Sequence, residues 1–267
     1  PCSLRAAGCA LVVEAELEPP LDSDARLGLA QHADLGPAVD VLMDGFYKDA
    51  LTLAAEEFSE AEMEAMRPVL SRVNGQLRRF TRTMLFLQAN GRCGERLRSP
   101  SLEPPPSGGS LMICVHKPAT GEIVGVVEVS IEPKDGRVPG DIRPLELPWS
   151  PLPRVAYISN LAVASQERKR GLGTRMLRAA EGLAARWGFE EVYLHADSEK
   201  SELLGFYAKQ EYVQLPELDA PEWVIAFSGR KQTRYHCRKL DDVAVERLAA
   251  AADTLKAGRP KKTNKYT

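Results

Sequence analysis

Residues 156–163 read Ala-Tyr-Ile-Ser-Asn-Leu-Ala-Val, and residues 168–174, shortly after them, read Arg-Lys-Arg-Gly-Leu-Gly-Thr. The first stretch has the composition of a strand, and an amphipathic helical pattern begins at Gly171. A helix N-terminus exposes unpaired N–H groups and the positive end of the helix dipole, and glycines let an anion approach the backbone closely. The pattern therefore predicts a strand, a basic turn and a helix that together suit a pyrophosphate.

Other phosphate-binding motifs fit this chain less well. A P-loop needs Gly-x4-Gly-Lys-Ser/Thr, which is absent. A dinucleotide-binding fold needs Gly-x-Gly-x-x-Gly after the first strand, whereas the two glycines here lie midway along the chain. Taken alone, Arg168-x-x-Gly171-x-Gly173 also fits a glycine-rich turn that binds no ligand.

Composition excludes several other classes of protein. Of the 267 residues, 44% are hydrophobic, which is typical of a globular chain. The net charge of −2 provides no overall field that would attract nucleic acid or an anionic membrane. No apolar run reaches the ~20 residues of a membrane span. Cysteine occurs five times without zinc or redox spacing, which predicts neither disulfides nor a metal site and favours a reducing compartment. These residues are Cys2, Cys9, Cys93, Cys114 and Cys237.

The hydrophobic periodicity predicts an α/β domain with helices early and late around a central sheet. Expected strands are residues 25–30, 111–116, 123–131, 154–163, 191–196, 212–215, 224–227 and 234–240. Expected helices are residues 35–46, a helix opened by a Ser59–Glu62 capping box, and residues 171–187, 199–209 and 241–256. We expect residues 1–24 to be a disordered segment, residues 25–240 to form the domain, and residues 241–267 to be a helix followed by a basic tail.

The second expected helix carries two further patterns. Apolar residues from Met66 to Met84 recur every three or four positions, which predicts a buried stripe, and Pro68 predicts a kink or a second helix start. Five glutamates in residues 56–64 precede five arginines in residues 67–82, which predicts a solvated helix face or, as the alternative, a binding patch. Residues 91–109 and 132–153 are rich in proline and predict two long exposed loops.

Leu161-Ala-Val163, the Arg168-x-x-Gly171-x-Gly173 element and the helix after it resemble the coenzyme A motif of the Gcn5-related N-acetyltransferase (GNAT) family. Phe206-Tyr207-x4-Tyr212 resembles the second motif of that family. The resemblance covers residues 111–215. It implies the GNAT fold, an α/β (α+β) architecture whose mixed, splayed central sheet is flanked by helices. It also implies acetyl-CoA as cosubstrate, bound where the fourth and fifth strands diverge.

The resemblance also implies which residues hold the cosubstrate. The backbone of Leu161, Ala162 and Val163 would pair with the pantetheine arm. The basic turn and the first helical turn would hold the pyrophosphate, through Arg168, Lys169, Arg170, Gly171, Leu172, Gly173 and Thr174. Relatives often have an asparagine where this chain has Lys200, so the implied contact there is a lysine with a cosubstrate phosphate.

Three residues are implied to catalyse the reaction. Tyr207 stands where many family members place the proton donor for the departing thiolate. Tyr157 and His195 resemble a pair that acts through water in several protein N-terminal acetyltransferases, and a histidine suits the role because its pKa lies near neutrality. The alternatives are a packing aromatic for Tyr207 and a packed or surface histidine for His195. Glu128 and Asp197 are expected to be solvated or structural.

The function implied by the resemblance is an acetyl-CoA-dependent N-acetyltransferase that acts on protein N-terminal α-amines and on lysine ε-amines by direct attack. The strand at residues 157–163 resembles plastid acetyltransferases, and the acid-poor residues 1–13 are consistent with a transit-peptide remnant, so we expect the plastid stroma or otherwise the cytoplasm. One alternative is an acetyltransferase for small amines. The other is a non-catalytic acyl-CoA-binding subunit that docks to a larger assembly through the face at residues 67–82.

Overall fold

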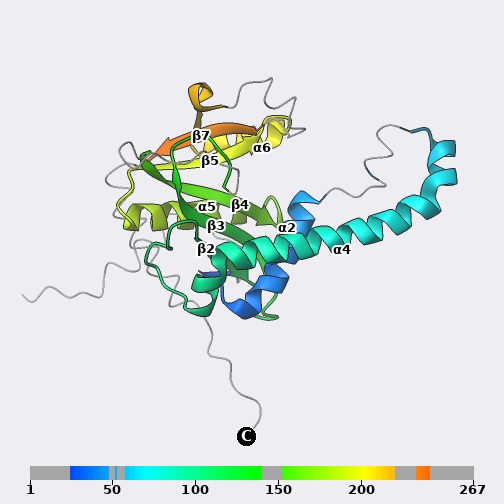
Figure 1. Ribbon diagram of the computed structural model, residues 1–267, viewed down its shortest axis with the longest axis horizontal. Helices are drawn as coiled ribbons and strands as arrows, with labels where there is room; N and C mark the ends of the chain where they lie inside the picture. Colours follow the sequence, from blue (N-terminus) through cyan, green and yellow to red (C-terminus); the bar gives the residue numbers. More distant parts are fainter. Residues whose placement is uncertain (1–24, 48–51, 53–57, 140–151, 220–232, 241–267) are drawn as a thin grey trace, which may run out of the picture.

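The computed structural model describes residues 25–47, 52, 58–139, 152–219 and 233–240 (Figure 1). Predictions for residues 1–24, 224–227 and 241–267 lie outside these ranges. The strands are β1 (Arg26–Leu29), β2 (Ser110–His116), β3 (Ile123–Pro133), β4 (Arg154–Val163), β5 (Glu191–Asp197), β6 (Val213–Gln214) and β7 (Thr233–Lys239). The helices are α2 (Leu35–Phe46), α4 (Glu60–Arg98), α5 (Leu172–Arg186) and α6 (Ser201–Lys209), with short 3-10 turns η1 (His32–Asp34), η2 (Ser165–Glu167) and η3 (Pro216–Leu218).

The strands form one mixed sheet in the order β1-β2-β3-β4-β5-β7-β6. Neighbouring strands are antiparallel except β4 and β5, which run parallel. These two strands are in register only at Ala156–Val192 and Tyr157–Tyr193, so they diverge from residue 158 onward. The predicted mixed and splayed sheet is therefore confirmed.

Helices cover both faces of the sheet, because side chains alternate between the faces along each strand. In β2, Leu111 and Ile113 belong to the core under α5, whereas Met112 and Cys114 belong to the core under α2 and α4. Side chains of α6 pack against the same core as α5. A third, smaller cluster contains Tyr157 and lies over the start of β4 and β5.

Most of the predicted elements are found within a few residues of their expected bounds. The Ser59–Glu62 capping box opens α4, with the Ser59 backbone N–H donating to the Glu62 carboxylate at 2.9 Å. Gly188 follows α5 with φ 84°, a left-handed conformation that costs glycine little. The strands predicted at residues 111–116 and 123–131 are the antiparallel pair β2–β3.

Two predictions about α4 were wrong, the loop from residue 91 and the buried stripe. Of the two alternatives for Pro68, the second helix start is excluded and the kink is not, because Pro68 lies inside one continuous helix that reaches Arg98. It continues because Ala89, Cys93 and Leu97 are buried in the core beside α2 and β2, which outweighs the weak helix propensity of the glycines in this stretch. The apolar stripe is not buried, since Phe80 is 64% exposed and Leu87 is 56% exposed.

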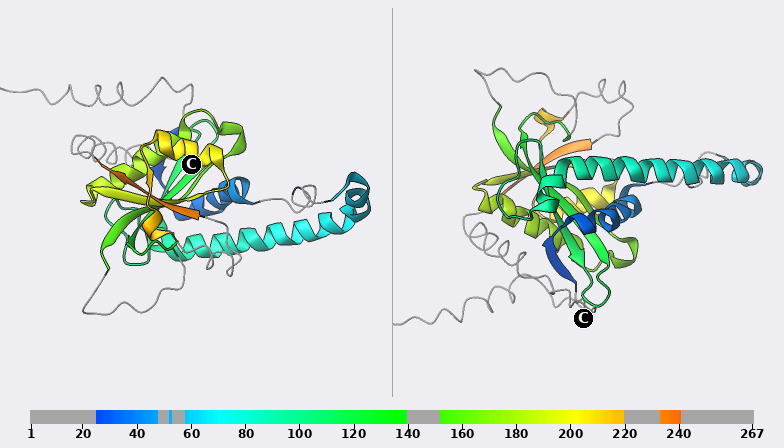
Figure 2. Two further views of the ribbon diagram at one scale, coloured as in Figure 1. Left: turned by 90° about the horizontal axis from the view of Figure 1, so that it is seen from above. Right: turned by 60° about the horizontal axis from the view of Figure 1, so that its bottom comes forward.

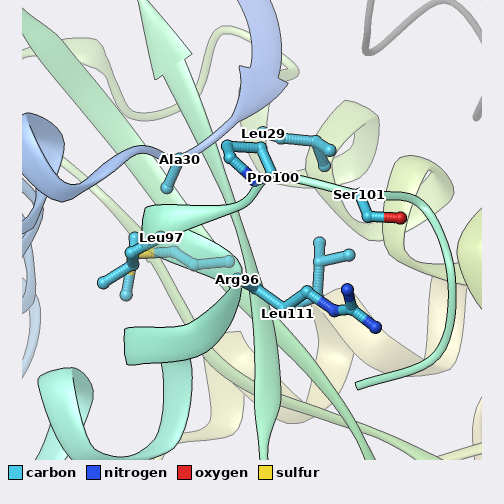
Figure 3. A pocket seen from close by; sticks show the side chains of 8 residues that line it. Leu29, Ala30, Arg96, Leu97, Pro100, Ser101 and Leu111 are labelled. Carbon is cyan, nitrogen blue, oxygen red and sulfur yellow. The ribbon is translucent and has the colours of Figure 1, made fainter. Parts of the chain in front are cut away.

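The two ends of α4 have different surroundings. Its C-terminal end packs against β1 and β2, where Leu97 lies near Ala30 and Leu111 beside a narrow crevice that Arg96 also lines (Figure 3). Its N-terminal half extends away from the sheet and from the other described helices (Figures 1 and 2). A helix of 39 residues is about 58 Å long, so α4 is much longer than its packing on the sheet requires.

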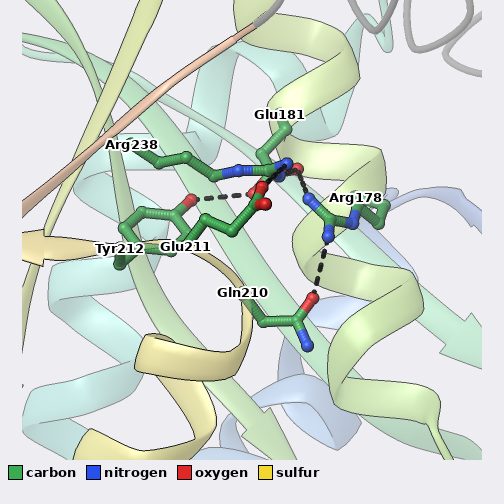
Figure 4. Close-up of polar contacts among 6 residues, drawn as sticks. All are labelled: Arg178, Glu181, Gln210, Glu211, Tyr212 and Arg238. Atoms are coloured by element: carbon green, nitrogen blue, oxygen red, sulfur yellow. Dashed lines mark hydrogen bonds and ion pairs between the residues drawn. The ribbon is translucent and has the colours of Figure 1, made fainter.

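A polar network ties α5, the turn after α6 and β7 together (Figure 4). The Glu181 carboxylate, which has no solvent exposure, accepts hydrogen bonds from Arg178 at 2.8 Å and from Arg238 at 2.6 Å. The Tyr212 hydroxyl donates to its other oxygen at 3.0 Å. The second terminal nitrogen of Arg178 donates to the Gln210 side chain at 3.0 Å, and that of Arg238 donates to the Glu211 carboxylate at 3.0 Å. The residues of the second sequence motif are thereby fixed to the helix of the first.

Candidate functional site

The structure brings Tyr157 and His195 into contact. They lie on β4 and β5, just where the two strands begin to diverge, and their side chains point to the same face of the sheet. The Tyr157 hydroxyl lies 2.7 Å from Nδ1 of His195, and Nε2 of His195 lies 3.1 Å from the carbonyl oxygen of Gly136. Because a carbonyl can only accept, Nε2 carries the proton and Nδ1 accepts from the Tyr157 hydroxyl.

Aromatic rings enclose this pair. Tyr235, on β7, stacks on Tyr157 with ring centroids 6.5 Å apart and contacts the His195 ring at 4.8 Å. Tyr157 is 2% exposed, and burial raises the pKa of its phenol well above the usual range, with smaller contributions from Tyr235 and Tyr207. The phenol therefore stays protonated at neutral pH and can relay a proton, but it does not act as a phenolate base.

Tyr207 is buried in α6, on the side of the sheet that α5 covers. Its ring makes edge-on contacts with Phe206 at 5.2 Å and with Tyr212 at 5.7 Å. Burial raises the pKa of the Tyr207 phenol, so this group also remains protonated and can serve as a proton donor. Packing and proton donation are compatible here, since the ring is held in place by its aromatic neighbours.

The start of α5 offers backbone donors to an anion. Gly171 is the N-cap with φ 78°, and within the described residues no side chain caps this end of the helix. The first intrahelical hydrogen bond runs from the Arg175 N–H to the Gly171 carbonyl at 3.1 Å. The N–H groups of Leu172, Gly173 and Thr174 therefore have no carbonyl acceptor within the helix. This arrangement fits a pyrophosphate.

The three basic residues before the helix have different surroundings. Arg168 donates to the carbonyl of Val163 at 3.0 Å and to that of Asp44 at 3.3 Å, so it fixes the turn to β4 and α2. Arg170 is paired with Glu167 at 2.6 Å. Lys169 is exposed and has a left-handed backbone with φ 60°. The side chain of Lys169 is therefore the best placed of the three to meet a negatively charged ligand.

The backbone of β4 is irregular where the cosubstrate arm is expected. Val126 is opposite Ala162 but Glu128 is opposite Ser159, so β4 contains one extra residue, and Asn160 has φ 53°. This is a β-bulge, which re-aims the strand locally. Leu161, Ala162 and Val163 follow the bulge, in the part of β4 that has no register partner in β5. Their backbone is thus available on the β5 side.

Glu128 stabilises this bulge. It is fully buried and accepts from Asn160 at 2.8 Å and from Arg92 of α4 at 3.0 and 3.1 Å. The structural alternative for Glu128 is therefore confirmed and the solvated one was wrong. Asp197 lies at the end of β5, half-buried, 3.9 Å from the Lys200 ammonium.

Lys200 lies at the start of α6 and lines an open depression of about 430 Å³. The other lining residues are Glu199, Ser201, Glu202, Leu203 and Phe206. Phe206 also faces Gly173, where an added Cβ would lie 3.6 Å from its ring. The depression and the first turn of α5 therefore share a wall, so the Lys200 side chain lies on the side of the fold expected for the phosphates.

Sequence reasoning missed three residues that shape the site. Gly136 fixes the tautomer of His195, and the sequence placed it only in the long loop predicted at residues 132–153. Asn160 was read as an ordinary strand residue, although asparagine tolerates positive φ better than most residues do. Arg92 was assigned to an exposed loop.

The described residues carry neither a metal-binding cluster nor a membrane-spanning helix. They contain no group of three or more histidine, cysteine, aspartate or glutamate side chains arranged to hold a metal ion. None of the described helices combines the length and the apolar character that crossing a membrane would require.

Comparison with known families gives one match. Residues 80–212, which include β2 to α6, match the profile of the acetyltransferase (GNAT) family. The match contains both sequence motifs and the residues of the candidate site discussed above, apart from Asp44 and Tyr235. The resemblance described from the sequence is confirmed.

Curated relatives occur in Arabidopsis thaliana. GCN5-related N-acetyltransferase 7, chloroplastic, is 27% identical over 77 residues, which are 29% of this chain and 27% of the relative. GCN5-related N-acetyltransferase 4, chloroplastic, is 34% identical over 65 residues, which are 24% of this chain and 22% of the relative. The chain therefore matches about a quarter of the length of these relatives.

Among solved structures, the PaiA N-acetyltransferase of Thermoplasma acidophilum in complex with coenzyme A is 14% identical, with a TM-score of 0.48 over 81% of this chain and 99% of that chain. The ribosomal-protein-S18-alanine N-acetyltransferase of Escherichia coli is 10% identical, with a TM-score of 0.43 over 80% of this chain and 93% of that chain.

Proposed function

Because residues 80–212 belong to the acetyltransferase (GNAT) family, we propose that this protein transfers acetyl groups from acetyl-CoA to protein amines, at N-terminal α-amines and at lysine side chains. Acetyl-CoA is the cosubstrate that family membership implies. The observation that carries the choice of substrate is the Tyr157–His195 hydrogen bond, because this pair resembles the proton-accepting pair of protein N-terminal acetyltransferases.

The chain supplies binding groups on two sides of the diverging strands. The N–H groups from Lys169 to Thr174 hold the pyrophosphate, with the charges of Lys169 and Lys200 beside them. The backbone of residues 161–163, aimed by the Asn160 bulge, pairs with the pantetheine arm and polarises the thioester carbonyl. Acetyl-CoA supplies an activated acyl carbon and a thiolate leaving group.

The catalytic residues move two protons. As the amine nitrogen bonds to the acyl carbon, Tyr157 accepts the amine proton through a water and passes its own hydroxyl proton to Nδ1 of His195. His195 becomes an imidazolium whose Nε2–H still donates to the Gly136 carbonyl. Tyr207 donates its proton to the sulfur as the carbon–sulfur bond breaks, and before the next turnover it regains a proton from water while His195 releases one to water. The products are an N-acetylated amine and coenzyme A with a free thiol.

We also propose a plastid location. Its support is that the two Arabidopsis relatives are named as chloroplastic. A fluorescent fusion of the full-length natural protein tests this, and exclusion of the fusion from plastids would contradict it.

The test of the activity is acetyl transfer to two peptides, followed by mass spectrometry. One peptide has a free N-terminus and no lysine, and the other has a blocked N-terminus and one lysine. We expect both to be acetylated, the first faster. Acetylation of a small amine such as a polyamine, with neither peptide modified, would contradict the proposed substrate class. Binding of acetyl-CoA without any turnover would contradict the enzyme itself.

Three variants test the assigned roles. Tyr207→Phe, Tyr157→Phe and His195→Gln each remove a proton-transferring group while keeping a similar shape. We expect turnover to fall by about 10²-fold or more, the usual contribution of general acid–base catalysis, with the affinity for acetyl-CoA unchanged. Unchanged turnover in all three variants would reject the site assignment but not the family.

A further inference from the structure

The exposed stripe on α4 is a regular heptad repeat. With Met63 at position a, the a positions are Met63, Leu70, Leu77 and Met84. The d positions are then Met66, Val73, Phe80 and Leu87. All eight are apolar over 25 consecutive residues, which is the pattern of a coiled-coil seam. We call these eight residues the α4 seam.

The α4 seam is open to solvent in the single chain. Its last five residues are each more than a third exposed, and Phe80 reaches 64%. The N-terminal half of α4 also extends away from the sheet (Figures 1 and 2). An apolar surface of this length, about 36 Å along the helix, is unusual on an isolated domain and marks an interaction site.

The α4 seam lies on the opposite side of the helix from the domain. Between Met63 and Cys93, the buried core contacts of α4 come from heptad positions c and f. Arg82 at f is paired with Asp40 at 2.6 Å, and Ala89 at f and Cys93 at c are buried in the core. Asn74, at a bordering e position, accepts from the Tyr47 hydroxyl at 2.7 Å. A second helix can therefore lie along the seam without displacing the domain.

We propose that the α4 seam pairs with the same seam of a second copy of this chain, as a parallel two-stranded coiled coil in register. The flanking positions favour this occupant. In a parallel pair each g residue faces the e residue five positions later in the partner, which sets Glu62 at g against Arg67 at e of the second copy. Within one chain Glu62 accepts from Ser59 and Arg67 is paired with Glu64 at 2.8 Å, so the contact with the second copy adds to these exposed local pairs. The remaining e and g positions carry no charge, so nothing in the flanks opposes self-association.

Residues that disfavour a helix interior lie away from the seam. Pro68 and Gly75 both occupy f positions, where they face solvent in a coiled coil. The basic residues Arg72, Arg78 and Arg79 are at b and c positions, outside the contact. The repeat ends at Gly91, the next a position, in the stretch where Ala89 and Cys93 of α4 are buried in the core. The two domains of the dimer then lie on opposite flanks of the coil.

The test is the molar mass of the full chain in solution, measured by light scattering during size-exclusion chromatography. We expect twice 29.3 kDa for the unaltered chain and 29.3 kDa for the double variant Leu77→Glu, Phe80→Glu. Arg72→Glu is the matched control, because it changes the net charge by the same amount on the same helix but off the seam, and it should remain dimeric.

Either of two results would overturn the proposal. One is an unaltered chain of 29.3 kDa, which would mean that something other than a second copy covers the seam. The other is a double variant that stays dimeric. Because the seam residues are exposed, circular dichroism should show a folded double variant, and its acetyl-transfer rate per chain should match that of the Arg72→Glu control.

A cross-linking experiment tests the parallel orientation. Met66→Cys places a thiol at a d position near one end of the seam. A parallel pair brings the two substituted positions together, so oxidation should yield a disulfide between them, identified by peptide mapping. An antiparallel pair would set residue 66 opposite residue 84, and a dimer in which this disulfide does not form would reject the parallel arrangement.

Discussion

The Arg238 guanidinium donates to the Glu181 carboxylate at 2.6 Å, although the two residues are 57 positions apart and lie on β7 and α5. Both side chains are buried. Since β7 also carries Tyr235, which contacts the His195 ring, this ion pair helps to hold one wall of the candidate active site against the helix that begins with the phosphate-binding turn.

Removing the Arg238 guanidinium should lower the free energy of unfolding. Arg238→Met leaves the Glu181 carboxylate buried with one partner fewer, and losing one member of a buried pair typically costs about 3–5 kcal/mol. Arg178→Met is the matched control, since it removes another arginine from the same carboxylate but at a more exposed position. Urea unfolding should show a larger loss of unfolding free energy for Arg238→Met than for Arg178→Met. An equal loss in the two variants would contradict the expectation that the more buried arginine contributes more.

Gly136→Ala should lower turnover by a loss of positioning. Gly136 has φ 69°, and a Cβ there would lie 2.0 Å from the Leu218 carbonyl oxygen, so the backbone has to move. The carbonyl that accepts from His195 would move with it, and displacements of this kind cost roughly ten- to hundredfold in rate. Gly121→Ala, at φ 72° with open space around it, is the control for backbone strain alone and should leave turnover nearly unchanged.

Gly171→Ala should weaken acetyl-CoA binding, because this residue begins α5 with φ 78° and a side chain there distorts the first turn. Gly188→Ala places the same change at the other end of the helix, at φ 84°. Both variants should lose about 1–2 kcal/mol of stability. Calorimetric titration with acetyl-CoA should show weaker binding for Gly171→Ala only. Equal affinities would contradict the proposed cradle.

Stability should fall in strongly alkaline solution. Burial raises the pKa of Tyr207 above its ordinary value of 10.0, so above pH 10 the unfolded chain loses this proton while the folded chain keeps it. The folded state then binds more protons, and the free energy of unfolding drops by about 1.4 kcal/mol per pH unit for such a group. Between pH 10 and 11, the free energy of unfolding measured in urea should fall less steeply for Tyr207→Phe than for the unaltered chain. An identical pH dependence in both proteins would contradict the contribution of Tyr207.

The sequence was most informative where local pattern and packing agree. The strand at residues 154–163, the glycine turn and the helix after it were predicted almost to the residue because their periodicity, turn residues and capping all indicate the same elements. The pairing of Tyr157 with His195 could be expected only from a resemblance, since no local rule sets the register of two parallel strands separated by a helix.

The wrong prediction of a buried stripe on α4 has a physical reason. An apolar repeat every three or four residues describes a helix face that avoids water, and it does not say whether that face is covered by the same chain or by another. Arg92 was misplaced for a related reason. Gly91 and Gly94 look like loop residues in isolation, but the burial of Cys93 and the Arg92–Glu128 ion pair, whose partners are 36 residues apart, keep the helix intact there.

The two register pairs between β4 and β5 have a consequence for protection against hydrogen exchange. From Ile158 to Val163, the backbone amides that point toward β5 lack a strand neighbour, so in the free protein they should exchange with deuterated solvent much faster than amides of β4 that donate to β3. A bound pantetheine arm would act as a short substitute strand and slow that exchange. The acetyl donor would then complete the middle of the sheet, and the protein would reach its full cooperativity only while holding its substrate.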